Sequence, residues 1–136
     1  MSITVKKENI DEYMKIMELE ATGDYLYAQM LPAGQQVIYA QVGLTPLAIK
    51  NIVLAFTKEL ILLIELDPVG HFIARHTSLA LKDIESLEFK KKWMQSSLII
   101  KTAKYRDIVL KIPNELANMA WQKPNLEKLI ANSWSV

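Results

Sequence analysis

The stretch ELILLIELDPVGHFIARHTSLAL, residues 59–81, decides the fold. Its first part, residues 59–67, is apolar on both faces of an extended chain, which is typical of a strand covered on both sides. Residues 67–70 then read Asp-Pro-Val-Gly, and a type I turn favours Asp first, Pro second and Gly fourth. The stretch therefore predicts a β-hairpin whose second strand runs through residues 71–81.

Apolar residues alternate with polar ones on both sides of this hairpin, as expected for strands with one buried face. The segments with this pattern are residues 35–44, 51–57, 84–89, 96–102 and 105–112. The side chains expected to face the core are Ile38, Ala40, Val42, Leu44, Ile52, Leu54, Phe56, Leu87, Phe89, Leu98, Ile100, Ile108, Leu110 and Ile112. The connections after residue 89 are short, so neighbouring strands should be antiparallel.

Helical spacing of apolar residues appears at the two ends of the chain. Near the N-terminus these residues are Ile10, Tyr13, Met14, Met17 and Ala21, and near the C-terminus they are Leu126, Leu129, Ile130 and Trp134. Asn9 and Glu12 predict a capping box for the first helix, which should end at Thr22. A second short helix is expected from Asp24 to Leu31, before Pro32.

These elements predict a mainly β (α+β) fold: a partly open antiparallel barrel of about seven strands with a C-terminal capping helix. Residues 1–31 should form a helical N-terminal extension, and residues 32–136 the main domain. The apolar face of the extension must be covered by its own barrel or by another copy. We favour another copy, because the C-terminal helix already covers one end of the barrel.

Several segments resemble the strands of bacterial pleckstrin-homology-like domains of the YokE-like and GRAM-like kind. They are LAFTKELILLIE (54–65), LKDIESLEFKK (81–91), SSLIIKT (96–102) and YRDIVLKIP (105–113), and the resemblance covers about residues 35–133. It implies a PH-like fold. Leu60 stands where the family usually has Arg, and the expected first hairpin, residues 40–51, contains a single base, Lys50. The resemblance therefore does not imply phosphoinositide binding.

Composition limits the chemistry that the chain can perform. The 136 residues are 51% hydrophobic and 23% charged, with a net charge of +1 and no cysteine. The lack of cysteine excludes disulfides and cysteine-ligated metals and weakly favours a reducing compartment. The N-terminus lacks the apolar core of a signal peptide, and glutamine, glycine and proline interrupt the longest uncharged stretch, residues 25–49. We expect a cytoplasmic protein without a transmembrane segment.

No catalytic, cofactor or metal site is evident among the polar residues. His71 and His76 lie five positions apart, so they should point to opposite sides of a strand, and His76 should be half-buried with a satisfied hydrogen bond. The acids of the first helix lack the histidines that accompany them in di-metal bundles. The four glycines are scattered and form no phosphate-binding loop. We therefore expect no enzyme activity and no cofactor.

Residues 82–111 carry eight bases and four acids, a local charge of +4. The candidate site for an anionic partner is Lys90, Lys91, Lys92 and Trp93, with Lys101, Lys104 and Arg106 from the next two strands. Clustered cations beside an aromatic side chain suit lipid headgroups, acidic protein segments or single-stranded nucleic acid. The alternative is a solubilising strand end, because lysine also protects exposed sheet edges.

These observations leave three functional hypotheses open. The first is a non-enzymatic PH-like interaction module that binds a protein or another copy of itself. The second is peripheral binding of anionic lipid through the basic strand edge, and the third is a small-ligand carrier or enzyme that uses the barrel interior. The third has least support, because aliphatic side chains should fill that interior. The net charge of +1 does not favour a nucleic-acid partner.

Overall fold

The computed structural model describes residues 3–31, 50–103 and 107–132. Its elements are α1 (Lys7–Ile16), β1 (Tyr25–Leu31), β2 (Lys50–Phe56), β3 (Leu60–Leu66), β4 (Phe72–Ala80), the 3-10 turn η1 (Leu81–Asp83), β5 (Ile84–Lys90), β6 (Gln95–Thr102), β7 (Ile108–Pro113) and α3 (Gln122–Ala131). The seven strands form one antiparallel sheet in the order β4-β3-β2-β1-β7-β6-β5. The predicted mainly β architecture with a helix at each end is confirmed.

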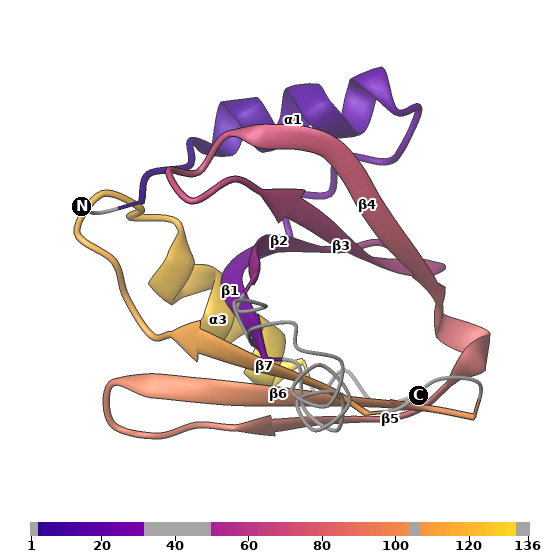
Figure 1. The fold of residues 1–136 in the computed structure, drawn as a ribbon. Coiled ribbons are helices and arrows are strands. Elements are labelled where there is room, and N and C mark those ends of the chain that lie inside the picture. The colour runs from indigo at the N-terminus through magenta and orange to yellow at the C-terminus, as the bar shows by residue number, and fades with distance from the viewer. Residues whose placement is uncertain (1–2, 32–49, 104–106, 133–136) are drawn as a thin grey trace, which may run out of the picture.

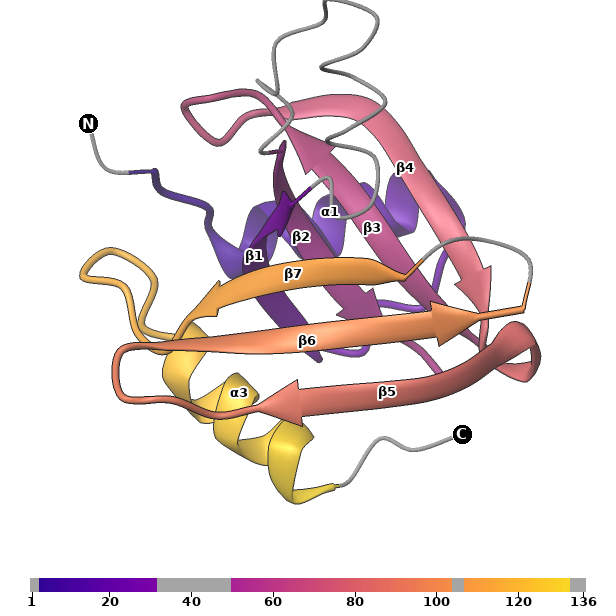
Figure 2. The same ribbon diagram turned by 60° about the horizontal axis from the view of Figure 1, so that its bottom comes forward.

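The sheet bends so that β5, β6 and β7 lie below the β2–β4 part, as Figure 1 shows. The main core fills the space between the two parts and takes Leu98, Ile100, Leu110 and Ile112 from one side and Leu54, Phe56 and Ile61 from the other. Leu126 and Leu129 of α3 join the same core, and Figure 2 shows α3 beside the β5–β7 part.

Strand β3 is covered on both faces, as its apolar sequence, interrupted only by Glu65, predicts. Ile61 and Leu63 point into the main core, whereas Leu62 and Ile64 point to a second cluster beneath α1. The turn after β3 is also as predicted. The Gly70 amide donates to the Asp67 carbonyl at 3.0 Å, and Asp67 Oδ1 accepts the amides of Val69 and His71.

Helix α1 packs on the outer face of β2–β4 of its own chain, so the expected contact between copies is wrong for this face (Figure 1). Ile10, Tyr13 and Met14 are buried there. Two hydrogen bonds from tyrosine hydroxyl groups join the helix to the sheet. The Tyr25 hydroxyl on β1 donates to Asp11 Oδ1 on α1 at 2.5 Å, and the Tyr13 hydroxyl on α1 is hydrogen-bonded to His76 Nδ1 on β4 at 2.7 Å. Burial, followed by the bond to the Asp11 carboxylate, raises the pKa of Tyr25 well above its ordinary value.

The bounds of α1 also differ from the prediction. The helix begins at Lys7, with Lys6 as an N-cap that makes no side-chain bond, so Asn9 lies inside the helix and the capping box is wrong. It ends at Ile16 instead of Thr22. The Thr22 hydroxyl instead donates to the Phe56 carbonyl at 2.7 Å, which joins the chain before β1 to the end of β2.

The helix expected from Asp24 to Leu31 is wrong, because residues 25–31 form β1 in the middle of the sheet. Leu26 and Ala28 face the main core, whereas Tyr25 and Tyr27 face the cluster under α1. Apolar side chains are thus needed on both faces, which removes the alternation that would have indicated a strand. The strand expected at residues 35–44 lies outside the described residues.

Helix α3 supplies hydrogen bonds where β1 and β7 separate. The β1–β7 pairing runs from Leu31–Val109 to Gln29–Lys111. If the same register continued, Tyr27 would lie opposite Pro113. Proline has no amide hydrogen to donate. The buried Gln122 amide takes its place: its Oε1 accepts the Tyr27 amide at 2.8 Å, and its Nε2 donates to the carbonyls of Tyr27 and Pro113 at 2.9 Å.

One turn further along α3, Asn125 Nδ2 donates to the carbonyls of Gly23 and Tyr25. Lys128 completes the row with an ion pair to Asp24 at 2.6 Å. One stripe of α3 therefore satisfies the free edge of β1, while Leu126 and Leu129 face the core. The C-terminal helix is confirmed as a structural cap; Trp134 lies outside the described residues.

Candidate functional site

The last residue of β5 and the turn that leads to β6, together residues Lys90–Met94, expose two large apolar side chains. Trp93 is 93% exposed and Met94 is 75% exposed. Such exposure contributes nothing to the core, and large exposed apolar groups that occur together mark interaction sites. We refer to residues Lys90–Met94 as the basic turn, because three consecutive lysines precede Trp93.

The backbone of the basic turn is held in place by Asn114, which lies just after β7. The side-chain Nδ2 of Asn114 donates to the carbonyls of Lys92 at 2.7 Å and Trp93 at 3.1 Å. The backbone N–H of Asn114 donates to the Met94 carbonyl at 3.1 Å. The Ser96 hydroxyl donates to Asn114 Oδ1 at 2.6 Å, which fixes the orientation of the amide. The exposed tryptophan thus stands on a turn with a defined conformation.

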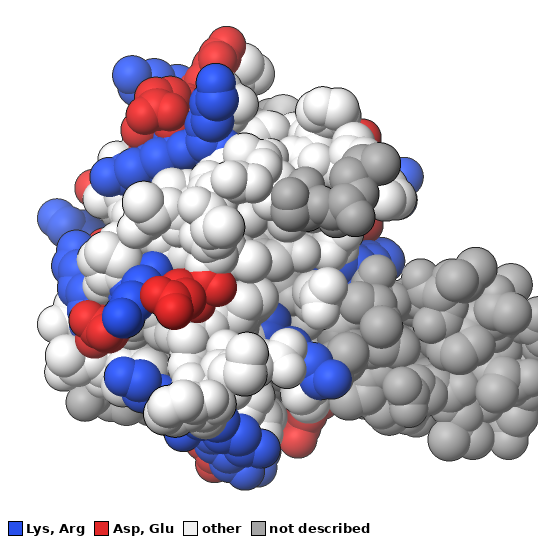
Figure 3. All heavy atoms as spheres, turned by 90° about the vertical axis from the view of Figure 1, so that its left-hand side faces the viewer, with Lys and Arg blue, Asp and Glu red and all other residues white. Residues whose placement is uncertain are grey.

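The lysines of the turn carry uncompensated charge. Among the described residues, no ion pair includes Lys90, Lys91, Lys92 or Lys111. Lys90 and Lys111 lie on either side of Ser97 in the strand register, on the outer face of the β5–β7 part. The face of the molecule in Figure 3 carries both signs of charge, and lysine and arginine side chains lie at its upper left, along its left side and at its lower edge.

The structure does not bring all the predicted site residues together. Lys101 is exposed, but it lies opposite Ser86 near the other end of β6. It lies six positions after Gln95, which places it about 20 Å from the turn along the strand. Lys104 and Arg106 lie outside the described residues. The candidate residues that lie together are therefore Lys90, Lys91, Lys92 and Trp93, and Met94 and Lys111 lie beside them.

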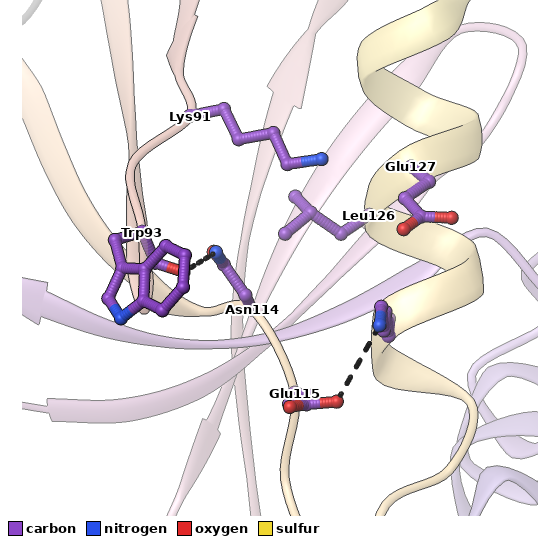
Figure 4. A pocket seen from close by; sticks show the side chains of 7 residues that line it. Lys91, Trp93, Asn114, Glu115, Leu126 and Glu127 are labelled. Atoms are coloured by element: carbon purple, nitrogen blue, oxygen red, sulfur yellow. Dashed lines mark hydrogen bonds and ion pairs between the residues drawn. The ribbon is translucent and has the colours of Figure 1, made fainter.

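A shallow hollow lies between the basic turn, the β7–α3 connection and α3 (Figure 4). Its volume is about 290 Å³, and it is open to solvent on one side. The residues that line it are Lys91, Trp93, Asn114, Glu115, Lys123, Leu126 and Glu127. Lys123 and Glu115 form an ion pair at 3.9 Å, whereas no ion pair to a described residue includes Lys91 or Glu127.

The two histidines occupy separate places, although only His76 lies on β4 and His71 precedes the strand. The His71 ring is exposed beside the Asp67 carboxylate at 3.1 Å, and the backbone amide of His71 is the main cause that lowers the pKa of Asp67. His76 is half-buried and bonds Tyr13 on α1. Within residues 3–31, 50–103 and 107–132, no group of three or more His, Asp or Glu side chains could hold a metal ion.

No protein-family model matches this chain, and comparison with curated proteins and with solved structures finds no significant match. The resemblance to PH-like domains thus stays a prediction from the strand patterns. In the described part of the chain, neither helix has the length and apolar character needed to cross a bilayer.

Proposed function

We propose that the protein is a non-enzymatic binding module that associates peripherally with anionic membrane surfaces through the basic turn. The observation that carries the proposal is Trp93, 93% exposed on a turn whose backbone Asn114 holds in place. Tryptophan is enriched at membrane–water interfaces, because its ring is apolar and its N–H can form a hydrogen bond with water.

The unpaired lysines favour an anionic surface. A Lys side chain near an anionic membrane contributes about 1 kcal/mol, so Lys90, Lys91 and Lys92 together contribute about 3 kcal/mol. This attraction acts over about 8 Å at physiological ionic strength. Glu85 and Glu88 on β5, and Glu115 and Glu127 around the hollow that Lys91 lines, reduce the field, but no acid belongs to the turn itself. Electrostatic attraction is therefore expected to dominate, and Trp93 adds anchoring.

The shape of the site favours a membrane over a protein. A stable protein interface buries about 800 Å² on each partner, and a single aromatic side chain supplies only about 150–250 Å². A bilayer accepts a projecting side chain without a matching pocket. Because the Asn114 bonds fix the turn in advance, little conformational entropy is lost when it docks.

The test is co-sedimentation with vesicles that contain increasing fractions of phosphatidylglycerol in phosphatidylcholine, at several salt concentrations. We expect binding that rises with the anionic fraction and falls with salt. Replacement of Lys90, Lys91 and Lys92 by Gln should weaken binding about 100-fold, as follows from about 3 kcal/mol. Trp93→Ala should weaken it less.

The matched control replaces Lys58, Lys82 and Lys101 by Gln, which changes the net charge equally at exposed positions away from the turn. This variant should keep most of the binding. The proposal is wrong if the wild-type protein does not bind highly anionic vesicles at low salt, or if both triple variants lose binding equally.

A second candidate function is self-association through the outer face of β5–β7. Ile99 and Val109 lie side by side there, half-buried, and neither described helix packs on them. Light scattering after size exclusion should then show a dimer for the wild-type protein and a monomer for Ile99→Lys. A monomeric wild-type protein removes this candidate.

A further inference from the structure

The hollow behind the basic turn combines opposite charges with an apolar base. Leu126, which is buried in α3, forms its base, and the Trp93 ring forms one side (Figure 4). Its volume of about 290 Å³ is at the lower limit of small-molecule sites, which begin at about 300 Å³. The hollow therefore suits a small polar group rather than an acyl chain.

The charges of the hollow balance. Lys123 and Glu115 neutralise each other across 3.9 Å, and this leaves the Lys91 ammonium and the Glu127 carboxylate without an ion pair to a described residue. The two come from different elements, since Lys91 follows β5 and Glu127 lies on α3. A simple anion would gain from Lys91 and be repelled by Glu127. A group that carries both signs can satisfy both side chains.

We infer that the hollow binds the headgroup of an amino-phospholipid, a phosphodiester that also carries a primary ammonium group. This inference rests on the proposed membrane binding. Lys91 interacts with the phosphate and Glu127 with the ammonium group, while the exposed Trp93 ring contacts the carbon atoms between them. Because Trp93 belongs to both the projecting turn and the side of the hollow, insertion of the turn brings the hollow to the headgroup layer.

The test compares vesicles with equal fractions of phosphatidylserine or phosphatidylglycerol, both in phosphatidylcholine. The two lipids carry the same net charge, but phosphatidylserine has a primary ammonium group and a carboxylate where phosphatidylglycerol has hydroxyl groups, and the quaternary ammonium of phosphatidylcholine is present equally in both vesicle types. The wild-type protein should bind the phosphatidylserine vesicles about tenfold more tightly, which corresponds to one good charged contact. Glu127→Gln should reduce this preference to about onefold without weakening binding to phosphatidylglycerol.

Two control variants separate recognition from general attraction. Lys92→Gln removes a charge that does not line the hollow, so it should weaken binding to both lipids and keep their ratio. Glu85→Gln changes an exposed carboxylate elsewhere on β5 and should leave the ratio unchanged. Glu127 is exposed on α3, so Glu127→Gln should unfold at the wild-type temperature, and this is checked by circular dichroism.

Soluble glycerophosphoserine distinguishes a free headgroup from one in a bilayer. If the hollow recognises the headgroup, millimolar glycerophosphoserine should displace the protein from phosphatidylserine vesicles much more than from phosphatidylglycerol vesicles. Equal binding of both vesicle types by the wild-type protein overturns the headgroup inference and leaves the membrane proposal intact. Absence of binding to either vesicle type overturns both.

Discussion

Gln122→Leu tests the role of α3 as the hydrogen-bonding neighbour of β1. The Gln122 side chain is fully buried and makes three bonds to backbone groups, two on Tyr27 and one on Pro113. Leucine keeps a similar volume but offers no donor or acceptor. The Tyr27 amide, the Tyr27 carbonyl and the Pro113 carbonyl would all lose this partner at once.

The magnitude follows from these three groups. A buried backbone group left unsatisfied costs about 1–3 kcal/mol, although neighbouring effects are not additive. We therefore expect Gln122→Leu to lower the free energy of unfolding by about 3–5 kcal/mol. This is a large part of the 5–15 kcal/mol that is typical of a folded domain. At this chain length the melting temperature should fall by roughly 10–20 °C.

The assay is urea denaturation of the wild-type protein and the variant, followed by circular dichroism. Gln95→Leu is the matched control, because Gln95 is exposed at the start of β6 and the same change there should alter stability by about 0.5 kcal/mol or less. A loss below about 1 kcal/mol for Gln122→Leu, with an unchanged dependence on urea, would refute the reasoning.

Three further predictions concern the β3–β4 hairpin. Gly70 has a φ of +100°, and a Cβ there would lie 2.9 Å from the Thr4 carbonyl oxygen, so Gly70→Val should cost at least about 1 kcal/mol in urea denaturation; an unchanged midpoint contradicts this. Ala74 lies at the irregularity in β4 with a φ of +55°, a backbone conformation that glycine adopts at lower cost. Ala74→Gly should therefore raise the melting temperature, whereas the control Ala80→Gly, at a φ of −70°, should lower it. A decrease for both variants would count against backbone strain at Ala74. The pKa of Asp67 is lowered in the folded state, chiefly by the hydrogen bond from the His71 backbone amide. The ionised Asp67 carboxylate therefore stabilises the fold above the ordinary carboxyl pKa, and this stabilisation is lost as the pH falls through the lowered pKa. Asp67→Ala should therefore be less stable than the wild-type protein at pH 6, and the difference should shrink as the pH falls below the ordinary carboxyl pKa; a constant difference would contradict the assignment.

The hairpin at residues 59–81 could be predicted because its signals are local. A run of apolar residues and the Asp-Pro-Val-Gly turn are readable without knowledge of the rest of the chain. The strand at residues 25–31 could not be predicted in the same way. Its Leu, Ala, Gln and Met residues favour a helix, and only the partners β2 and β7, distant in sequence, make it a strand.

The candidate site was readable only in part for a related reason. Lys90, Lys91, Lys92 and Trp93 are consecutive, so their proximity needs no knowledge of the fold. Lys101 lies apart from them, because each residue along the strand is about 3.3 Å further from the turn. Asn114 follows Trp93 by 21 positions, and only the pairing of β6 with β7 brings it to the turn.

The stability of the fold and the chemistry of the site depend on different side chains, although these side chains lie on the same helix and strands. Gln122 and Leu126 are buried and hold α3 against the sheet, while the ends of Lys91, Trp93 and Glu127 are exposed. Surface changes away from buried networks alter stability by about 0.5 kcal/mol or less, so a loss of lipid binding in such variants cannot be ascribed to unfolding. Asn114 is the exception, because it fixes the basic turn and also lines the hollow. Its replacement would disturb the turn and the hollow together, and the exposed side chains are therefore the sharper tests of function.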